Sequence, residues 1–195
     1  MRVMGRGGEA CAHSAGFTLV EVMIALVVIV LALTGFSQSI VSSMVAGDAD
    51  AEVRRATEGG RQAMERVKGA NFKDIFALYN DDPGDDNTVI DAAGLPAPGS
   101  NFDVPGLSPI DGDPDGSVGK ITLPVVIDAG TGEAQLREDA LYTALGLPRD
   151  LDGDGVIDGV NHIDDYLILP VIVRVEWQGA SGRSYVEFKT LLVGI

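Results

Sequence analysis

The strongest constraint on this chain is an apolar run that begins at Phe17 and lasts to about Phe36. As a helix it is long enough to span a bilayer, because about 20 apolar residues cover the hydrocarbon core. A single charged residue, Glu21, lies inside the run. A carboxylate in lipid costs about 3 kcal/mol on insertion scales, so it needs a partner. We therefore predict a transmembrane helix over residues 17–40, in which Glu21 is functional.

The run opens with the hexapeptide Gly16-Phe17-Thr18-Leu19-Val20-Glu21. This motif, followed by an apolar helix, resembles the type III signal of prepilins, the precursors of type IV pilins and of type II secretion pseudopilins. The resemblance implies that prepilin peptidase cuts after Gly16 and that the new amino terminus, Phe17, is then methylated. Residues 1–16 are accordingly expected to be a leader peptide.

Cleavage would give Glu21 a nearby cation. The new amine on Phe17 would lie four residues, or about one helical turn, before Glu21. The two charges could neutralise each other within one subunit or between neighbouring subunits, and breaking such a buried pair costs about 3–5 kcal/mol. The resemblance implies that Glu21 draws an incoming subunit into register, so the expected partners are other pilin or pseudopilin subunits. A snorkelling interfacial acid is the simpler alternative for Glu21.

The charges around the run predict its orientation. Arg2 and Arg6 precede it, which by the positive-inside tendency keeps the amino terminus cytoplasmic. We expect a single-pass protein of a bacterial inner membrane, in contact with its lipid, with a head in the periplasm or, after assembly, at the cell surface. A secretory signal peptide and a plain membrane anchor are alternatives. Neither explains the position of Glu21.

The helix is predicted to continue to Lys68, with residues 41–70 as its amphipathic half. Apolar or small residues recur there at three- and four-residue spacing, at Ala49, Val53, Ala56, Gly60, Met64 and Val67. Gly59 and Gly60 are points where the helix could bend. Many type IV pilins carry a proline early in this half, whereas this chain has none before Pro83. That departure favours a pseudopilin or a minor pilin over a major pilus subunit.

Residues 71–195 are predicted to form an α+β head. Residues 80–119 are rich in Asp, Gly, Pro and Asn and predict a surface loop. A short helix is expected at 138–145. Three stretches have the composition of strands: 120–128, 166–177 and 184–193. The last two are joined by a Gly-rich turn and predict a hairpin, so the expected fold is pilin-like, with a long N-terminal α-helix packed on a C-terminal antiparallel β-sheet.

Charge and cysteine content narrow the possible partners. The formal net charge is −15, and no basic patch is visible, so binding to nucleic acid is not expected. The only cysteine, Cys11, lies in the predicted leader, so the mature chain can form no disulfide. A small exported head without disulfides needs another source of stability, and calcium is one candidate.

The segment that starts at Asp150 resembles an EF-hand-type calcium loop. It has carboxylates at the first, third, fifth and ninth positions, a glycine at the sixth and a possible carbonyl ligand at the seventh. It departs from that pattern at the twelfth position, where Asn161 replaces a bidentate acid, and Asp164 or Asp165 could complete the shell. The predicted ligands are Asp150, Asp152, Asp154, Val156, Asp158, Asn161 and Asp164. A solvated Asp-Gly turn is the alternative.

A shorter echo of this loop occupies residues 111–122. It lacks acids at its ninth and twelfth positions, Gly119 and Thr122, and a proline interrupts it. An ordinary turn is therefore favoured there, and a second calcium ion is the alternative.

The sequence gives little support for a catalytic function. His162 would be the only histidine of the mature chain, and no hydrolase, metalloprotease or nucleotide-binding motif is present. We predict a structural protein: a minor pilin-like subunit of a type IV pilus or related filament, with a calcium-stabilised head. A type II secretion pseudopilin is the first alternative. A membrane-tethered calcium-binding module with no filament role is the second.

Overall fold

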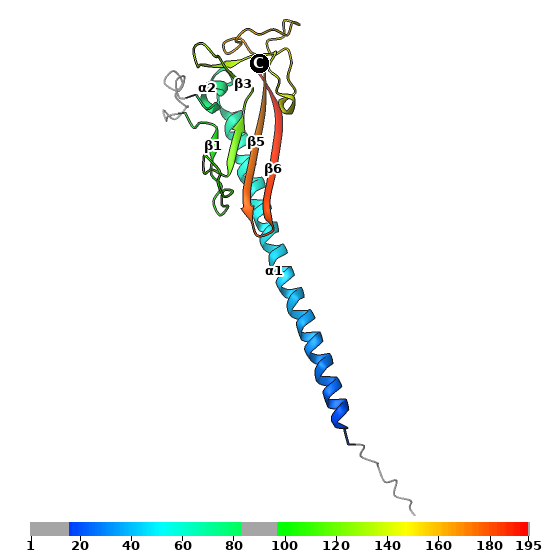
Figure 1. The fold of residues 1–195 in the computed structure, drawn as a ribbon. Coiled ribbons are helices and arrows are strands. Elements are labelled where there is room, and N and C mark those ends of the chain that lie inside the picture. Colours follow the sequence, from blue (N-terminus) through cyan, green and yellow to red (C-terminus); the bar gives the residue numbers. More distant parts are fainter. Residues whose placement is uncertain (1–15, 83–96, 195) are drawn as a thin grey trace, which may run out of the picture. The chain divides into compact units, whose positions relative to one another are not determined.

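The computed structural model describes residues 16–82 and 97–194 (Figure 1). The chain divides into two compact units, one up to Met44 and the other from Val45 onward. Helix α1, Leu19–Gly69, contributes to both units. The two units are described separately below.

The first unit consists of the apolar part of α1. Every described side chain from Leu19 to Met44 is exposed, and an 18-residue window has a mean hydropathy of 2.7. Within the described residues, α1 is the one helix long and apolar enough to cross a membrane. It begins two residues later than predicted because Thr18 takes the N-cap position. The Thr18 Oγ1 accepts a hydrogen bond from the Glu21 amide at 3.2 Å, and the Thr18 carbonyl accepts one from the Val22 amide at 3.2 Å.

The second unit contains the rest of α1 and all described strands. The helical elements after α1 are η1 (Phe72–Asp74), α2 (Ile75–Tyr79) and η3 (Thr143–Leu145). The strands are β1 (Asn101–Phe102), β2 (Gly119–Thr122), β3 (Val125–Ile127), β4 (Ala134–Leu136), β5 (Ile168–Gly179) and β6 (Gly182–Val193). One antiparallel sheet has the order β1-β2-β5-β6, and β3 pairs with β4 in a second, two-stranded sheet.

The amphipathic half of α1 packs on the inner face of the four-stranded sheet. Met64 and Val67 share one core cluster with Val171 and Val173 of β5. Ala56 joins Val175 and Trp177 in a second cluster farther along the same strand. The predicted α+β arrangement, with a long helix on an antiparallel sheet, is confirmed. Val53 departs from its predicted place on the buried face and is 45% exposed.

The glycine pair of α1 permits this close packing. A Cβ at Gly60 would lie 2.4 Å from the Phe188 ring of β6, and one at Gly59 would lie 2.4 Å from the Val104 side chain. α1 runs through both positions without interruption. The absence of a side chain there lets the sheet and the segment after β1 approach the helix.

Two sequence predictions for the head are wrong. Residues 138–145 form no α-helix: Glu138 turns inward to accept backbone hydrogen bonds, and only the 3₁₀ turn η3 forms at the end of the stretch. The predicted strand 120–128 is two strands, β2 and β3, in different sheets. Pro124 separates them because it has no N–H to continue the ladder.

The predicted terminal hairpin is confirmed. β5 and β6 pair at every position from Ile168↔Val193 to Gly179↔Gly182, so the connection is only Ala180-Ser181. The predicted loop 80–119 contains the two-residue strand β1 and the first residue of β2, and its residues 83–96 lie outside the described residues.

Candidate functional site

The amino-terminal end of the apolar helix carries the predicted processing and assembly residues. Gly16 and Phe17 precede the N-cap, and the Phe17 side chain is 82% exposed. Glu21 lies in the first turn of α1, where the positive end of the helix dipole favours a carboxylate. No ion pair of Glu21 is found within the described part of the chain. The capping role of Thr18 was missed, although the spacing Thr-x-x-Glu before an apolar run is a known signal for a helix start.

The acidic loop at Asp150 is shaped by its own carboxylates. The Asp150 carboxylate accepts hydrogen bonds from the Gly153 amide at 2.6 Å and the Gly155 amide at 2.8 Å. Asp152 accepts from the Asp154 amide at 3.0 Å. Both glycines have positive φ, 84° and 85°, which explains the Asp-Gly alternation of this segment.

A buried carboxylate holds the two ends of this loop together. Glu138 is 1% exposed and accepts hydrogen bonds from the Leu151 amide, from the Asp152 amide at 3.3 Å and, through its other oxygen, from the Asp158 amide at 3.2 Å. Sequence reasoning missed Glu138 because its partners are 13 to 20 residues away. No local spacing signals such a contact.

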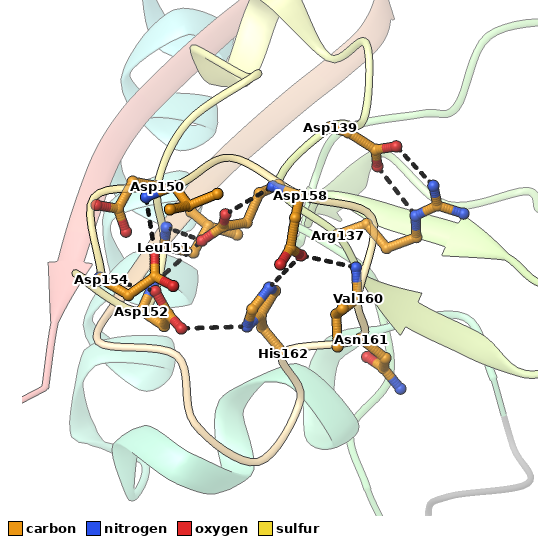
Figure 2. Close-up of polar contacts among 12 residues, drawn as sticks. Arg137, Asp139, Asp150, Leu151, Asp152, Asp154, Asp158, Val160, Asn161 and His162 are labelled. Carbon is orange, nitrogen blue, oxygen red and sulfur yellow. Dashed lines mark hydrogen bonds and ion pairs between the residues drawn. The ribbon is translucent and has the colours of Figure 1, made fainter.

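His162, to which the sequence analysis gives no catalytic role, lies inside the acidic cluster and is 5% exposed. Its Nε2 is 3.2 Å from Asp158 Oδ1, its Nδ1 is 3.1 Å from Asp165 Oδ1, and the same Nδ1 is 3.6 Å from Asp152 Oδ2. Figure 2 shows Asp152 and Asp158 reaching the ring from two sides. Burial alone would lower the pKa of His162, but the hydrogen bonds to Asp158 and Asp165 outweigh it and raise the pKa.

Asp158 is held as a carboxylate by its neighbours. The Val160 amide donates to its Oδ1 at 2.8 Å, and this bond is the main reason that the pKa of Asp158 is lowered, with His162 contributing next. An ionised Asp158 is the form that a cation would bind.

Three overlapping groups in this region could hold a metal ion, each with ligand atoms within 4.8 Å of one another. They are Glu138-Asp150-Asp152, Glu138-Asp158-His162 and Asp152-His162-Asp165. The structure therefore brings together three of the predicted ligands, Asp150, Asp152 and Asp158. It also includes Asp165, the alternative to Asp164, and adds Glu138 and His162.

The other predicted ligands lie outside these groups. Asp154, Val156 and Asp164 are exposed. The Asn161 side chain oxygen accepts hydrogen bonds from the Leu136 amide at 3.0 Å and the Ile163 amide at 3.3 Å. Asn161 thus points toward β4 and away from the cluster (Figure 2).

The shorter acidic loop at 111–122 forms turns like those at Asp150, in which an Asp side chain accepts a hydrogen bond from a nearby backbone amide. Asp113 accepts from the Asp115 amide at 3.4 Å, and Asp115 accepts from the Ser117 amide at 2.9 Å. Among the residues that the structure describes, none of its carboxylates belongs to a potential metal group.

Comparison with known families identifies the amino-terminal part of the chain. The family model described as the prokaryotic N-terminal methylation motif matches residues 11–37. Comparisons with curated proteins and with solved structures give no match. The motif implies processing by prepilin peptidase and assembly with other pilin subunits, and the apolar helix is consistent with anchoring in the inner membrane. The methylation motif, followed by the apolar helix, is diagnostic of type IV prepilin-like proteins and supports a pilin or pseudopilin.

Proposed function

We propose that this chain is a minor structural subunit of a type IV pilus or related filament, cleaved after Gly16 and methylated on Phe17. In this proposal residues 17–40 anchor the subunit in the inner membrane and later enter the filament core. The head faces the periplasm and is stabilised by calcium. The uninterrupted course of α1 from Leu19 to Gly69, without the early proline of many pilins, supports a minor subunit.

One observation carries the filament function: a lone carboxylate in an exposed apolar helix, one turn from the proposed new amino terminus. Glu21 is surrounded by apolar residues of α1, and among the described residues no cation pairs with it. Its insertion in lipid is unfavourable until a cation neutralises it. The amine on Phe17, in the same or a neighbouring subunit, is a cation that cleavage would supply at the right distance along the helix.

Mass spectrometry of the native protein tests the processing step. The expected mature chain begins with N-methyl-Phe17, and a chain that still begins at Met1 contradicts the proposal. Glu21→Ala is expected to be processed and inserted but to enter filaments at least tenfold less than the wild type, since about 1.4 kcal/mol already gives a factor of ten. Val22→Ala, on the same helical turn, is the matched control and is expected to assemble normally.

The phenotype of a deletion mutant distinguishes a function in a pilus from a function in a type II secretion system. Loss of surface pili with intact protein secretion supports the minor pilin. Loss of secretion with intact pili assigns the chain to a type II secretion filament instead. A mutant that keeps both functions supports the membrane-tethered calcium-binding module.

The calcium proposal rests on the convergence of several carboxylates. Glu138, Asp150 and Asp152 converge on one point, and among the described residues no lysine or arginine forms an ion pair with them. Collecting such carboxylates is unfavourable unless a cation is shared between them. Calcium prefers oxygen ligands and tolerates irregular geometry, which fits this donor set. His162 contacts Asp152 as well as Asp158 and Asp165 and, when protonated, compensates part of this charge.

Thermal melting with and without calcium tests this proposal. Calcium at 100 times its Kd should stabilise the head by about 2.7 kcal/mol. Asp152→Asn is expected to abolish the calcium-dependent shift of the melting temperature, whereas Asp164→Asn, which alters an exposed acid outside the groups, should retain it. An equal shift in both variants, or none in the wild type, contradicts calcium binding at this loop.

A further inference from the structure

The buried imidazole of His162 faces carboxylate oxygens with both of its nitrogens. Nε2 lies 3.2 Å from Asp158 Oδ1, and Nδ1 lies 3.1 Å from Asp165 Oδ1 (Figure 2 shows the contact with Asp158). A neutral imidazole carries one N–H, so in either tautomer one nitrogen turns a lone pair toward an ionised carboxylate, which has no proton to donate. Two acceptors at this distance repel each other unless a second proton or a metal ion lies between them.

The two sides of the ring differ in what they offer a metal ion. On the Nδ1 side, Asp165 is an exposed carboxylate that can accept the one N–H of a neutral ring. On the Nε2 side, Glu138 and Asp158 form one group with His162, in which the ligand atoms lie within 4.8 Å of one another. Glu138 is withdrawn from water, since it is 1% exposed. A ring with its proton on Nδ1 therefore turns the Nε2 lone pair toward a buried group of two carboxylates.

The charge around the ring favours a divalent ion over a second proton. Four carboxylates have an oxygen within 4.8 Å of one of the ring nitrogens. They belong to Glu138, Asp152, Asp158 and Asp165. Among the described residues no lysine or arginine forms an ion pair with any of them. Because buried charges are unfavourable without a partner, the two charges of a divalent ion compensate this group better than the single charge of a proton.

We propose that Glu138, Asp158 and the Nε2 of His162 bind a divalent transition-metal ion of the zinc class. An imidazole nitrogen suits such ions, whereas calcium takes oxygen ligands. Two ligand atoms about 2.1 Å from a tetrahedral zinc ion lie about 3.4 Å apart, close to the 3.2 Å between Nε2 and Asp158 Oδ1. Asp165 would accept the Nδ1–H, as carboxylates commonly do for metal-bound histidines. Water would fill the remaining position.

Backbone hydrogen bonds hold the three ligands in place. The Asp158 amide donates to Glu138 Oε2 at 3.2 Å, which brings the two carboxylates together. The Val160 amide donates to Asp158 Oδ1 at 2.8 Å and fixes the orientation of that side chain. The His162 amide donates to the Leu136 carbonyl at the end of β4 at 2.8 Å. The ion would therefore join the segment directly after β4 to the far end of the acidic loop.

This site goes beyond the proposed calcium site and does not require it. The two sites share Glu138. Calcium would bind with Asp150 and Asp152, whereas the transition-metal ion would bind with Asp158 and His162. The two proposals therefore differ in the ion and in two of their three ligands.

Nitrogen-15 NMR of the full chain in detergent micelles tests the proposal with zinc as the only added metal. Zinc should shift the Nε2 resonance of His162 and leave the proton on Nδ1. The signals that are absent from His162→Gln identify the ring. A metal shift on Nδ1 would place the ion at Asp152 and Asp165 and overturn the proposal. A ring that carries protons on both nitrogens and does not respond to zinc would overturn it as well.

Calorimetric titration of variants with zinc tests the ligands. His162→Gln is expected to raise the zinc Kd at least about hundredfold, because even the loss of a group behind a metal ligand costs up to that factor. Asp165→Asn removes the carboxylate behind Nδ1 and should raise the zinc Kd about tenfold. Asp164→Asn changes the exposed acid next to it and is the matched control, with the wild-type Kd. Asp150→Asn should also bind zinc as the wild type does, although it removes a proposed calcium ligand.

The outcomes distinguish this site from the calcium site. Zinc binding on Nε2 without a calcium-dependent shift of the melting temperature supports this proposal and contradicts the calcium proposal. A calcium-dependent shift in a protein that does not bind zinc, or that binds it equally well after His162→Gln, overturns this proposal alone. If His162→Gln does not fold, the response of the wild-type ring to zinc still decides.

Discussion

The indole Nε1 of Trp177 donates a hydrogen bond to Glu52 Oε2 at 3.2 Å, which joins strand β5 to helix α1. The same carboxylate accepts a hydrogen bond from the Ala180 amide, 3.2 Å from each oxygen. One helix residue therefore holds both the end of β5 and the hairpin turn. Trp177 is 1% exposed and is the only tryptophan of the chain, so its fluorescence reports on this contact.

Glu52→Ala is expected to lower the free energy of unfolding of the head by about 1–3 kcal/mol, because it leaves a buried indole N–H without an acceptor. The tryptophan emission should shift as water reaches the ring. Glu52→Gln keeps an acceptor oxygen and should restore part of the loss. Glu58→Ala is the matched control, since Glu58 is exposed and, among the described residues, accepts a hydrogen bond only from Gln62 of the same helix, at 3.1 Å. Equal melting of the Glu52→Ala and Glu58→Ala proteins would contradict this role.

Gly60→Val is expected to destabilise the head by about 1–3 kcal/mol, the usual effect of overpacking. Even a Cβ at this position would lie 2.4 Å from the Phe188 ring, and the branched side chain needs more space still. Thermal melting of the purified protein measures the loss. Gly47→Val introduces the same side chain into the same helix where nothing lies within 4 Å, so it controls for helix propensity. A Gly60→Val protein as stable as Gly47→Val would show that β6 can move away from the helix.

The parts of the fold that follow local periodicity could be predicted from the sequence. The long helix follows from the continuous apolar run and the three- and four-residue spacing after Asp48, and the terminal hairpin from alternation around Val173. The loop at Asp150 was also predictable, because its Asp-Gly alternation forms turns from bonds only two to five residues long.

The parts that depend on distant contacts could not be predicted. Glu138 turns inward and no helix forms there, because the backbone N–H groups of Leu151 and Asp158 donate to its carboxylate. No feature of the sequence near residue 138 indicates these distant contacts. The burial of His162 among acids could not be predicted for the same reason, since it depends on how the loop closes. The split at Pro124 belongs to the same class: the missing N–H can interrupt a strand, but the exchange of sheets depends on pairing with β4.

Tyr166→Phe is expected to remove an alkaline dependence of stability. The Tyr166 hydroxyl donates to the Phe72 carbonyl, and burial raises the pKa of Tyr166 to about 12. Between pH 10 and about 12 the unfolded chain loses this proton while the folded chain keeps it, so the free energy of unfolding falls by up to about 2–3 kcal/mol as the pH rises. Denaturant melts across this range should show that slope in the wild type and in Tyr185→Phe, whose altered tyrosine is 60% exposed. A Tyr166→Phe protein with an unchanged slope would assign the dependence to another group.

Glu138→Gln separates the fold of the acidic loop from its affinity for calcium. The amide oxygen of the new side chain could still accept one of the backbone hydrogen bonds, but its NH₂ group would face a second N–H donor. The metal-free head should therefore lose about 1.5–3 kcal/mol of unfolding free energy. The substitution would also remove one of the three carboxylates that converge with Asp150 and Asp152. Calcium titration by calorimetry should therefore show a Kd raised at least about tenfold, which corresponds to about 1.4 kcal/mol.

The matched control for this experiment is Glu133→Gln, which changes an exposed acid directly before strand β4. It should leave both the metal-free melting temperature and the calcium Kd unchanged. Addition of a chelator should return the wild type and Glu133→Gln to their metal-free melting temperatures and have little effect on Glu138→Gln. If Glu138→Gln lowers the metal-free stability but binds calcium with the wild-type Kd, Glu138 only supports the loop, because a carboxylate that contributed charge to the ion could not be replaced by an amide without loss of affinity.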